Sequence, residues 1–196
     1  MFLVPVILFA ISATLTPGPN NALVMGSAFN FGVLRSLPLL FGMCLGFPAL
    51  LLTVSAGLDV VLQYVPDFLL YLRVIGSAYL LYLAYKIFNI SSLGEVTEVD
   101  APLGFLHGAA FQWVNPKSWI VAISAVSSFS FLSESQLVNG LILSAVFVVI
   151  SLPCVGTWMI AGGSIRGILN TPTRIAWFNR IMALLLVGSV IQAFFV

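Results

Sequence analysis

Two short segments of the chain can bind a charged small molecule through their backbone groups. The first comprises Thr16, Pro17, Gly18, Pro19, Asn20 and Asn21, and the second Val114, Asn115, Pro116 and Lys117. Proline lacks an N–H donor and disfavours helix at the residue before it, so each segment predicts a break in a helix. Gly18 and Asn115 suit an N-cap, and the proline that follows each one suits the first helical position.

The two ends of a broken helix offer complementary chemistry. The N-terminus of a half-helix presents unpaired N–H groups and about half a positive charge, which suit a carboxylate. The C-terminus of the other half presents free carbonyls, which suit an ammonium group. The pair of breaks therefore predicts a site for a zwitterionic amino acid. The alternative is that the prolines only shape helix packing, since proline and glycine are common in membrane helices.

Polar side chains near the breaks extend the predicted site. The amides of Asn20, Asn21, Gln112 and Asn115 can each donate and accept, and bonding between helices is the alternative to substrate contact. Lys117 either holds a substrate carboxylate or pairs with carbonyls freed near Thr14 to Thr16. The predicted substrate-binding residues are Thr16, Pro17, Gly18, Pro19, Asn20, Asn21, Gln112, Asn115, Pro116 and Lys117.

The composition places these segments in a lipid bilayer. Hydrophobic residues make up 61% of the 196 residues and charged residues only 7%, whereas a soluble domain has about 25% charged residues. A net charge of +1 provides no basic surface for nucleic acid. A single histidine and two separated cysteines provide neither a metal cluster nor a nucleophile with its base. We therefore expect no cofactor, no metal and no enzyme activity.

Uncharged stretches long enough to span a bilayer recur along the chain, which predicts an all-α membrane protein with six transmembrane helices. A span needs about 20 apolar residues. The predicted spans are Phe2 to Met25, Leu37 to Leu58, Phe68 to Phe88, Phe105 to Phe131, Leu137 to Ala161 and Ile175 to Val196. The first lacks the positive start of a signal peptide, so it is read as a helix. The whole chain is predicted to form one transmembrane domain.

The breaks fall in the first and fourth predicted spans, about half the chain apart. Each break then lies in the first helix of a three-helix unit, with one unit at about 1–90 and the other at about 103–196. Units with an odd number of spans have opposite orientation. This is the pattern of an inverted 3+3 repeat, in which discontinuous helices form a midplane binding site.

The distribution of lysine and arginine predicts the orientation. With six spans, one side of the membrane receives Arg35, Lys86, Arg166, Arg174 and Arg180. The other side receives Arg73 together with Asp59, Asp67 and Glu134. Cytoplasmic loops are enriched in lysine and arginine, so the first side is cytoplasmic and both termini lie outside. The acidic residues Glu95, Glu98 and Asp100 accompany Lys86 in the third loop but count for little in this rule.

Several of these segments carry a resemblance to a known family. The run from Phe9 through the first break, followed by Gly26, Gly32, Gly42 and Gly46, resembles the opening of the LysE/RhtB family of amino-acid exporters. Residues 72–80 resemble that family's third helix, and Phe105 to Gly108 with Phe111 and residues 115–117 resemble its fourth. The runs at 112–115 and 183–187 are closer to its cysteine and O-acetylserine exporter branch.

The resemblance implies export of small amino acids or their derivatives across a bacterial inner membrane, driven by the proton gradient. No carboxylate lies clearly inside a predicted span, although pumps usually have one. Either a loop carboxylate folds inward, or His107 or Lys117 titrates, or transport is not coupled to protons. A passive channel and a scaffold protein are the alternatives to an exporter. The substrate and the oligomeric state stay open, with a homodimer among the options.

Other residues are assigned structural roles. Arg73 is predicted to reach the outer interface, and Cys44 and Cys154 are read as small buried residues rather than a redox pair. The motifs Gly42-x-x-x-Gly46 and Gly104-x-x-x-Gly108 predict close approach between helices.

Overall fold

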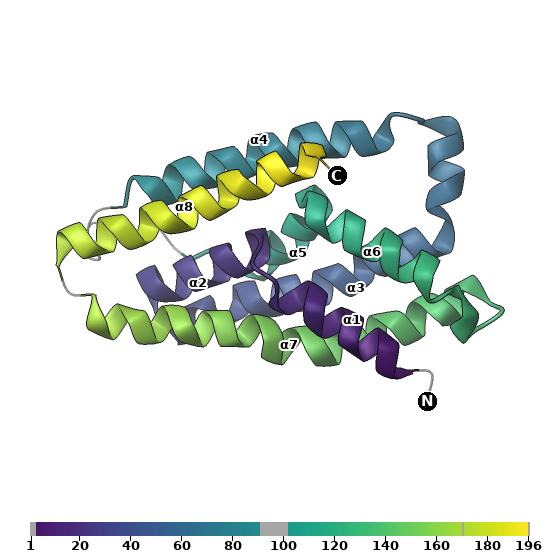
Figure 1. Ribbon diagram of the computed structural model, residues 1–196, viewed down its shortest axis with the longest axis horizontal. Helices are drawn as coiled ribbons and strands as arrows, with labels where there is room; N and C mark the ends of the chain where they lie inside the picture. Colours follow the sequence, from purple (N-terminus) through teal and green to yellow (C-terminus); the bar gives the residue numbers. More distant parts are fainter. Residues whose placement is uncertain (1–2, 91–101, 170, 196) are drawn as a thin grey trace.

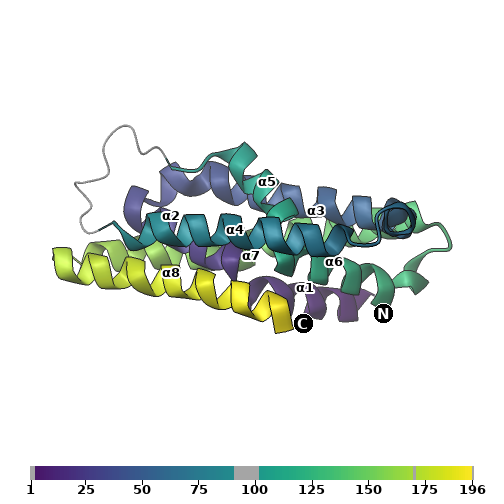
Figure 2. The same ribbon diagram turned by 90° about the horizontal axis from the view of Figure 1, so that it is seen from above.

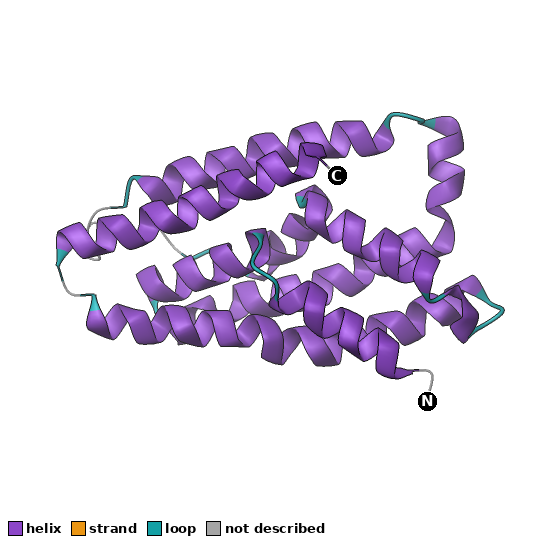
Figure 3. Ribbon diagram, in the orientation of Figure 1, coloured by secondary structure: helices purple, strands orange, loops and turns teal. Residues whose placement is uncertain are grey.

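The computed structural model describes residues 3–90, 102–169 and 171–195, and within these it leaves the side chains of residues 59–62, 192, 193 and 195 aside. The described residues form helices and connections, with no strand among them (Figure 3). The helices are α1 Leu3–Leu15, α2 Pro19–Phe31, α3 Val33–Tyr64, α4 Phe68–Phe88, α5 Phe105–Val114, α6 Pro116–Ser128, η1 Ser130–Leu132, α7 Gln136–Ile168 and α8 Pro172–Phe195.

Four described helices are long and apolar enough to cross a membrane, namely α3 over Val33–Leu58, α4, α7 and α8 over Pro172–Ile191. The pair α1 and α2 can form a fifth span, bent by 54° at its break. The helices α5 and α6, of 10 and 13 residues, are each too short to span alone. The all-helical membrane fold is thus confirmed, whereas the six-span 3+3 arrangement stays a proposal.

Both predicted helix breaks are present, and in each the second helix begins at a proline. Helix α2 begins at Pro19 with Gly18 as its N-cap, and α6 begins at Pro116 with Asn115 as its N-cap. The predicted ends of the spans are less accurate. The first span continues to Phe31 rather than Met25, and α7 continues to Ile168 rather than Ala161, because the residues that follow, Arg166 among them, can still extend a helix beyond the apolar stretch.

The long helices lie side by side in pairs. Helix α3 packs along α7, and α4 packs along α8 as a separate layer (Figures 1 and 2). Helix α2 packs against α3, α7 and α8, while α5 packs on α3 and α1 packs on α7. In an inverted repeat with α1–α4 as one unit and α5–α8 as the other, α3 would correspond to α7 and α4 to α8.

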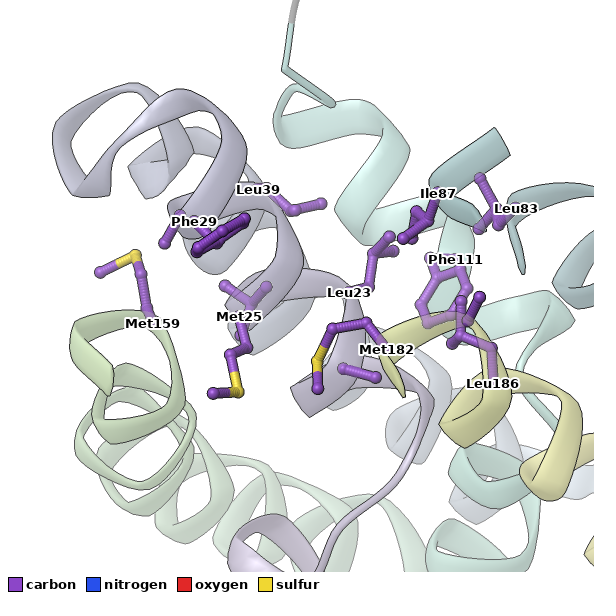
Figure 4. Packing of buried hydrophobic residues seen from close by; sticks show 14 of the residues in the cluster. Leu23, Met25, Phe29, Leu39, Leu83, Ile87, Phe111, Met159, Met182 and Leu186 are labelled. Carbon is purple, nitrogen blue, oxygen red and sulfur yellow. The ribbon is translucent and has the colours of Figure 1, made fainter. Parts of the chain in front are cut away.

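The described residues bury two hydrophobic clusters. One, here called the α2 core, surrounds α2 and includes Met25, Phe29 and Met182. Figure 4 shows Met25 and Phe29 between Met159 of α7 and Met182 of α8. The other, here called the α1 core, joins α1, α3, α6 and α7 and includes Phe147. The junction of these two clusters is where the helix breaks lie.

Glycines bring α3 and α5 into direct backbone contact. A Cβ added at Gly42, Gly46 or Gly108 would collide with backbone atoms of the opposite helix. These three positions confirm the predicted close approach. Gly104 is different, because nothing lies within 4 Å of a Cβ placed there. It is the N-cap of α5, so its prediction as a packing residue is wrong.

Most cations lie at one end of the molecule. Arg35 is in the first turn of α3, Lys86 in the last turn of α4 and Arg166 in the last turn of α7. These helix ends, and the start of α8 with Arg174, share the left-hand end of Figure 1; we call it the Arg-rich end. The side chain of Asp59 and the acidic residues of 95–100 lie outside the described residues.

Candidate functional site

A cavity lies at the breaks, between the two hydrophobic clusters. Together with the open space at its mouth, it has an empty volume of ≈ 510 Å³. Its polar wall comes from the breaks and its apolar wall from α3, α6 and α7. The lining residues are Ala13, Thr14, Gly18, Asn20, Asn21, Met43, Cys44, Phe47, Asn115, Lys117, Ser118, Val121, Phe147, Ser151 and Val155.

An amide network joins the two breaks. Asn20 Nδ2 donates to Gln112 Oε1 at 3.0 Å, and Gln112 Nε2 donates back to Asn20 Oδ1 at 3.1 Å. Asn115 Nδ2 donates to the same Asn20 oxygen at 3.1 Å, and the Ser118 hydroxyl donates to Gln112 Oε1 at 2.9 Å. Gln112 and Asn115 are buried. Residues about 92 positions apart in the chain are thereby held in one cluster.

The carbonyls freed at the end of α1 are bonded by side chains from beyond the break. Asn21 Nδ2 donates to the carbonyls of Thr14 and Thr16 at 2.8 and 3.0 Å. Lys117 Nζ donates to the Thr16 carbonyl at 3.0 Å, which is the pairing that the sequence left as the alternative to substrate contact. The ammonium of Lys117 also lines the cavity. It therefore joins the break in α1–α2 to the break in α5–α6.

The N-termini of α2 and α6 differ in their capping. At α6 the Asn115 side chain accepts from the Lys117 backbone N–H at 3.1 Å. At α2 the N-cap is Gly18, which has no side chain to accept such a bond. The N–H groups of the first helical turn have no partner within their own helix. Because Gly18, Asn20 and Asn21 line the cavity, the positive end of α2 faces it.

Asn21 also presents an acceptor without a donor. The residue is 3% exposed, and its Oδ1 accepts no hydrogen bond from any described group. A buried acceptor without a partner costs about 1–3 kcal/mol. The lining of the cavity thus includes Asn21 with its unpaired acceptor, the N-terminus of α2 and the Lys117 ammonium. A zwitterion presents the opposite group to each of these.

The structure brings the predicted site residues together but gives them unequal positions. Gly18, Asn20, Asn21, Asn115 and Lys117 line the cavity. Five others do not line it but shape or bond the breaks, namely Thr16, Pro17, Pro19, Gln112 and Pro116. His107 is exposed at the start of α5 and does not line the cavity.

Sequence reasoning missed part of the cavity wall. Ser118 and Ser151 line it without having been singled out, and Cys44 lines it although it was read only as a buried residue. Ser118 follows Asn115 by three residues, so helical spacing from the N-cap could have indicated it. Nothing in the sequence distinguishes Ser151 from the other serines, because its position depends on how α7 packs.

Arg73 lies apart from this cavity. Its guanidinium stacks over the Phe194 ring at 5.9 Å, and it lines a second cavity with Pro116, Trp119 and neighbouring apolar residues. Its predicted place near the non-cytoplasmic interface depends on the orientation of the molecule.

Comparisons with known proteins match almost the whole length of the chain. The family model for LysE type translocators matches residues 11–194. The cysteine/O-acetylserine efflux proteins of Salmonella paratyphi A and Salmonella typhi are 33% identical over 193 residues, which is 95% of this chain and 94% of each relative. That of Escherichia coli is 30% identical with the same coverage. No solved structure matches the chain.

Apolar helices broken around a polar cavity, with efflux proteins as relatives, define a membrane transport protein. The chain belongs to the LysE family of translocators. The resemblance read from the sequence is thereby confirmed, and so is the expectation that the protein is not an enzyme.

Proposed function

We propose that the protein is a secondary exporter of small amino acids or their derivatives from the cytoplasm, of the cysteine, O-acetylserine, homoserine or threonine type. The observation that carries the proposal is the cavity at the two breaks, which presents complementary groups to both ends of a zwitterion. Cysteine/O-acetylserine efflux proteins as relatives favour this substrate class. The apolar wall, with Phe47, Phe147 and Val155, suits a small side chain.

In the proposed complex the substrate carboxylate lies at the N-terminus of α2. There it meets the free backbone N–H groups of the first turn and the ammonium of Lys117. The position of Lys117 supports this arrangement, since a Cβ placed on Gly18 would lie 3.0 Å from the Lys117 Nζ. The substrate ammonium donates to Asn21 Oδ1, the acceptor that lacks a donor. The amide network of Asn20, Gln112 and Asn115 holds the two breaks in register.

The proposed transport cycle uses the inverted 3+3 repeat. The six spans are α1 with α2, α3, α4, α5 with α6, α7 and α8. The pairing of α3 with α7 and of α4 with α8 supports a twofold relation between the halves. The halves then rock around the cavity and expose it alternately to each side. Both termini lie outside, and the proton gradient drives the cycle.

The amide network provides the test. Replacing Asn20 or Asn115 with alanine removes the bonds that join the breaks, so both variants should lose export while remaining in the membrane. Export is measured as release of amino acids from overexpressing cells, with membrane content followed by immunoblot. Asn89→Ala is the matched control, because the Asn89 side chain is exposed and its hydrogen-bond partner among the described residues is the carbonyl of Tyr85 in α4. Wild-type export by Asn20→Ala would contradict the proposal.

The same measurements separate the exporter from a passive channel. Export by a transporter saturates with substrate, and a protonophore should abolish accumulation against a gradient. Flux that rises linearly with substrate concentration and is not changed by the protonophore would indicate a channel.

A further inference from the structure

A second reciprocal amide pair lies away from the cavity, at the Arg-rich end. Asn30 Nδ2 donates to Asn179 Oδ1 at 2.9 Å, and Asn179 Nδ2 donates to Asn30 Oδ1 at 3.2 Å. Both side chains are buried, with exposures of 4% and 0%. Asn179 also donates to the carbonyl of Ile90, just beyond α4. The pair therefore ties the last turn of α2 to α8 and to the end of α4.

Aromatic rings reinforce the same contact. Phe29 and Phe178 immediately precede the two asparagines, and their ring centroids lie 4.0 Å apart. Both rings are buried, and Phe29 lies in the middle of the α2 core (Figure 4). A pair of rings and a pair of amides thus close the space between α2 and α8.

Helix α2 is bounded at both ends by points where the helix is interrupted at a glycine. Gly18 is its N-cap in extended backbone, and Gly32 at its C-terminus has a φ of 90°. That backbone conformation is accessible to glycine at little cost. A helix of 13 residues between two such points can tilt as a unit. All of its residues except Asn20 and Phe31 are buried, so a tilt would open the interior.

The side chains around α2 are adaptable. Met25, Met43, Met159 and Met182 are all members of the α2 core, and they are every methionine of the chain except Met1. Methionine is unbranched and repacks readily. Backbone lies directly against glycine between α3 and α5, and at one point between α7 and α2, where a Cβ on Gly162 would collide with the Met25 carbonyl. Apart from that one point, the neighbours of α2 named here are side chains that can repack when the helix tilts.

We propose that α2 is a gate between the cavity and the Arg-rich end, and that the Asn30–Asn179 pair with Phe29 and Phe178 is the latch that holds the gate shut. The positive end of α2 lies at the cavity and its other end lies at the latch, so tilting α2 connects the two. The proposal rests on the proposed function, which makes the Arg-rich end the side of substrate entry. In this structure the gate is closed.

Cys44 provides a native reporter for the test. It lines the cavity and is 1% exposed, and Cys154 is the only other cysteine. In a Cys154→Ser background, a membrane-impermeant maleimide can be applied from the cytoplasmic side in inside-out vesicles. Asn30→Ala or Asn179→Ala should raise the rate of Cys44 labelling by about 5- to 30-fold, the range expected when hydrogen bonds that favour the closed state are removed.

Two controls separate gate opening from a loss of stability. Asn139→Ala removes another buried amide, at the opposite end of α7, and should leave Cys44 labelling unchanged. Labelling from the outside should not rise in the latch variants, whereas general loosening would raise it from both sides. Unchanged cytoplasmic labelling in both latch variants, or an equal rise from both sides, would overturn the proposal. This readout does not require export, so it stands apart from failure of the proposed function.

A cross-link tests whether the gate must move. In a chain without its native cysteines, Asn30→Cys and Asn179→Cys can be joined by a short bis-maleimide, and export is compared before and after the reaction. Cross-linking should abolish the export that the same variant shows beforehand. Full export by the cross-linked protein would also overturn the proposal.

Discussion

Asn20 and Asn21 are adjacent in the chain, yet their side chains bond to different partners. The Asn20 side chain bonds to Gln112 and Asn115 at the other helix break. The Asn21 side chain bonds instead to backbone carbonyls at the end of α1. The sequence identified both amides, because asparagine beside a helix break in an apolar span is unusual. It could not assign their partners, since these depend on how α5 meets α1 and α2.

Lys117 is the residue for which the sequence left two roles open. Its ammonium bonds to the Thr16 carbonyl and also lines the cavity. Replacing it with methionine keeps the stem and removes the charge. If Lys117 meets the substrate carboxylate, Lys117→Met should raise KM by about 10- to 100-fold, since a hydrogen bond to a charged group is worth about 1.5–3 kcal/mol.

The measurement for this variant is amino-acid uptake into inside-out vesicles at varied substrate concentration. Retention of the wild-type KM together with a lower melting temperature would assign Lys117 a structural role only. In that case the substrate carboxylate would be bound only by the backbone N–H groups at the N-terminus of α2.

Among the elements, α3 and α5 are held together most closely. Gly108→Ala should lower the melting temperature of the purified protein, because the added Cβ would meet backbone atoms of Leu39 and Met43, and overpacking of this kind costs about 1–3 kcal/mol. Gly188→Ala is the matched control. Gly188 lies in α8 with nothing within 4 Å of an added Cβ, so the melting temperature of the Gly188→Ala variant should not fall. An equal fall in the melting temperature of both variants would show that the contact between α3 and α5 does not cause the effect of Gly108→Ala.

The elements also show where sequence reasoning succeeds and where it fails. Helix breaks follow from local chemistry, so Pro17, Pro19 and Pro116 predicted them correctly. The proline inside α7, Pro153, does not end its helix, because neighbouring helices can satisfy the freed backbone groups. Helix α3 runs on to Tyr64 through a kink at Gly57, where φ is 140°. The predicted end at Leu58 is close to that kink, since the charge of Asp59 follows it.

At the scale of the whole molecule, the Arg-rich end sets the expected orientation. Thr171 lies exposed between α7 and α8 at this end, and Glu134 lies exposed before α7 at the other. In a chain without its native cysteines, Thr171→Cys should react with an impermeant maleimide from the cytoplasmic side only. Glu134→Cys should react from the outside only. The reverse pattern would place the termini in the cytoplasm and exchange the two faces of the proposed gate.

The proposed repeat relation is less visible in the sequence than the breaks that suggested it. In the predicted 3+3 arrangement each break lies at the start of a three-helix unit, but the helices around the two breaks differ in length. The break in α1–α2 lies between two helices of 13 residues, whereas α5 has 10 residues. Packing against Gly42 and Gly46 of α3 is what positions the shorter helix, and a contact of this kind cannot be read from one sequence.

The unpaired Oδ1 of Asn21 has a consequence for how the proposed site would bind the substrate ammonium. No carboxylate is among the described residues that line the cavity, so in the proposed complex this amide oxygen takes the place of a fixed negative charge. An acceptor already withdrawn from water has no hydration left to lose when an ammonium arrives. In the proposed complex, the desolvation that a carboxylate would undergo during binding is already complete for this neutral amide when the chain folds.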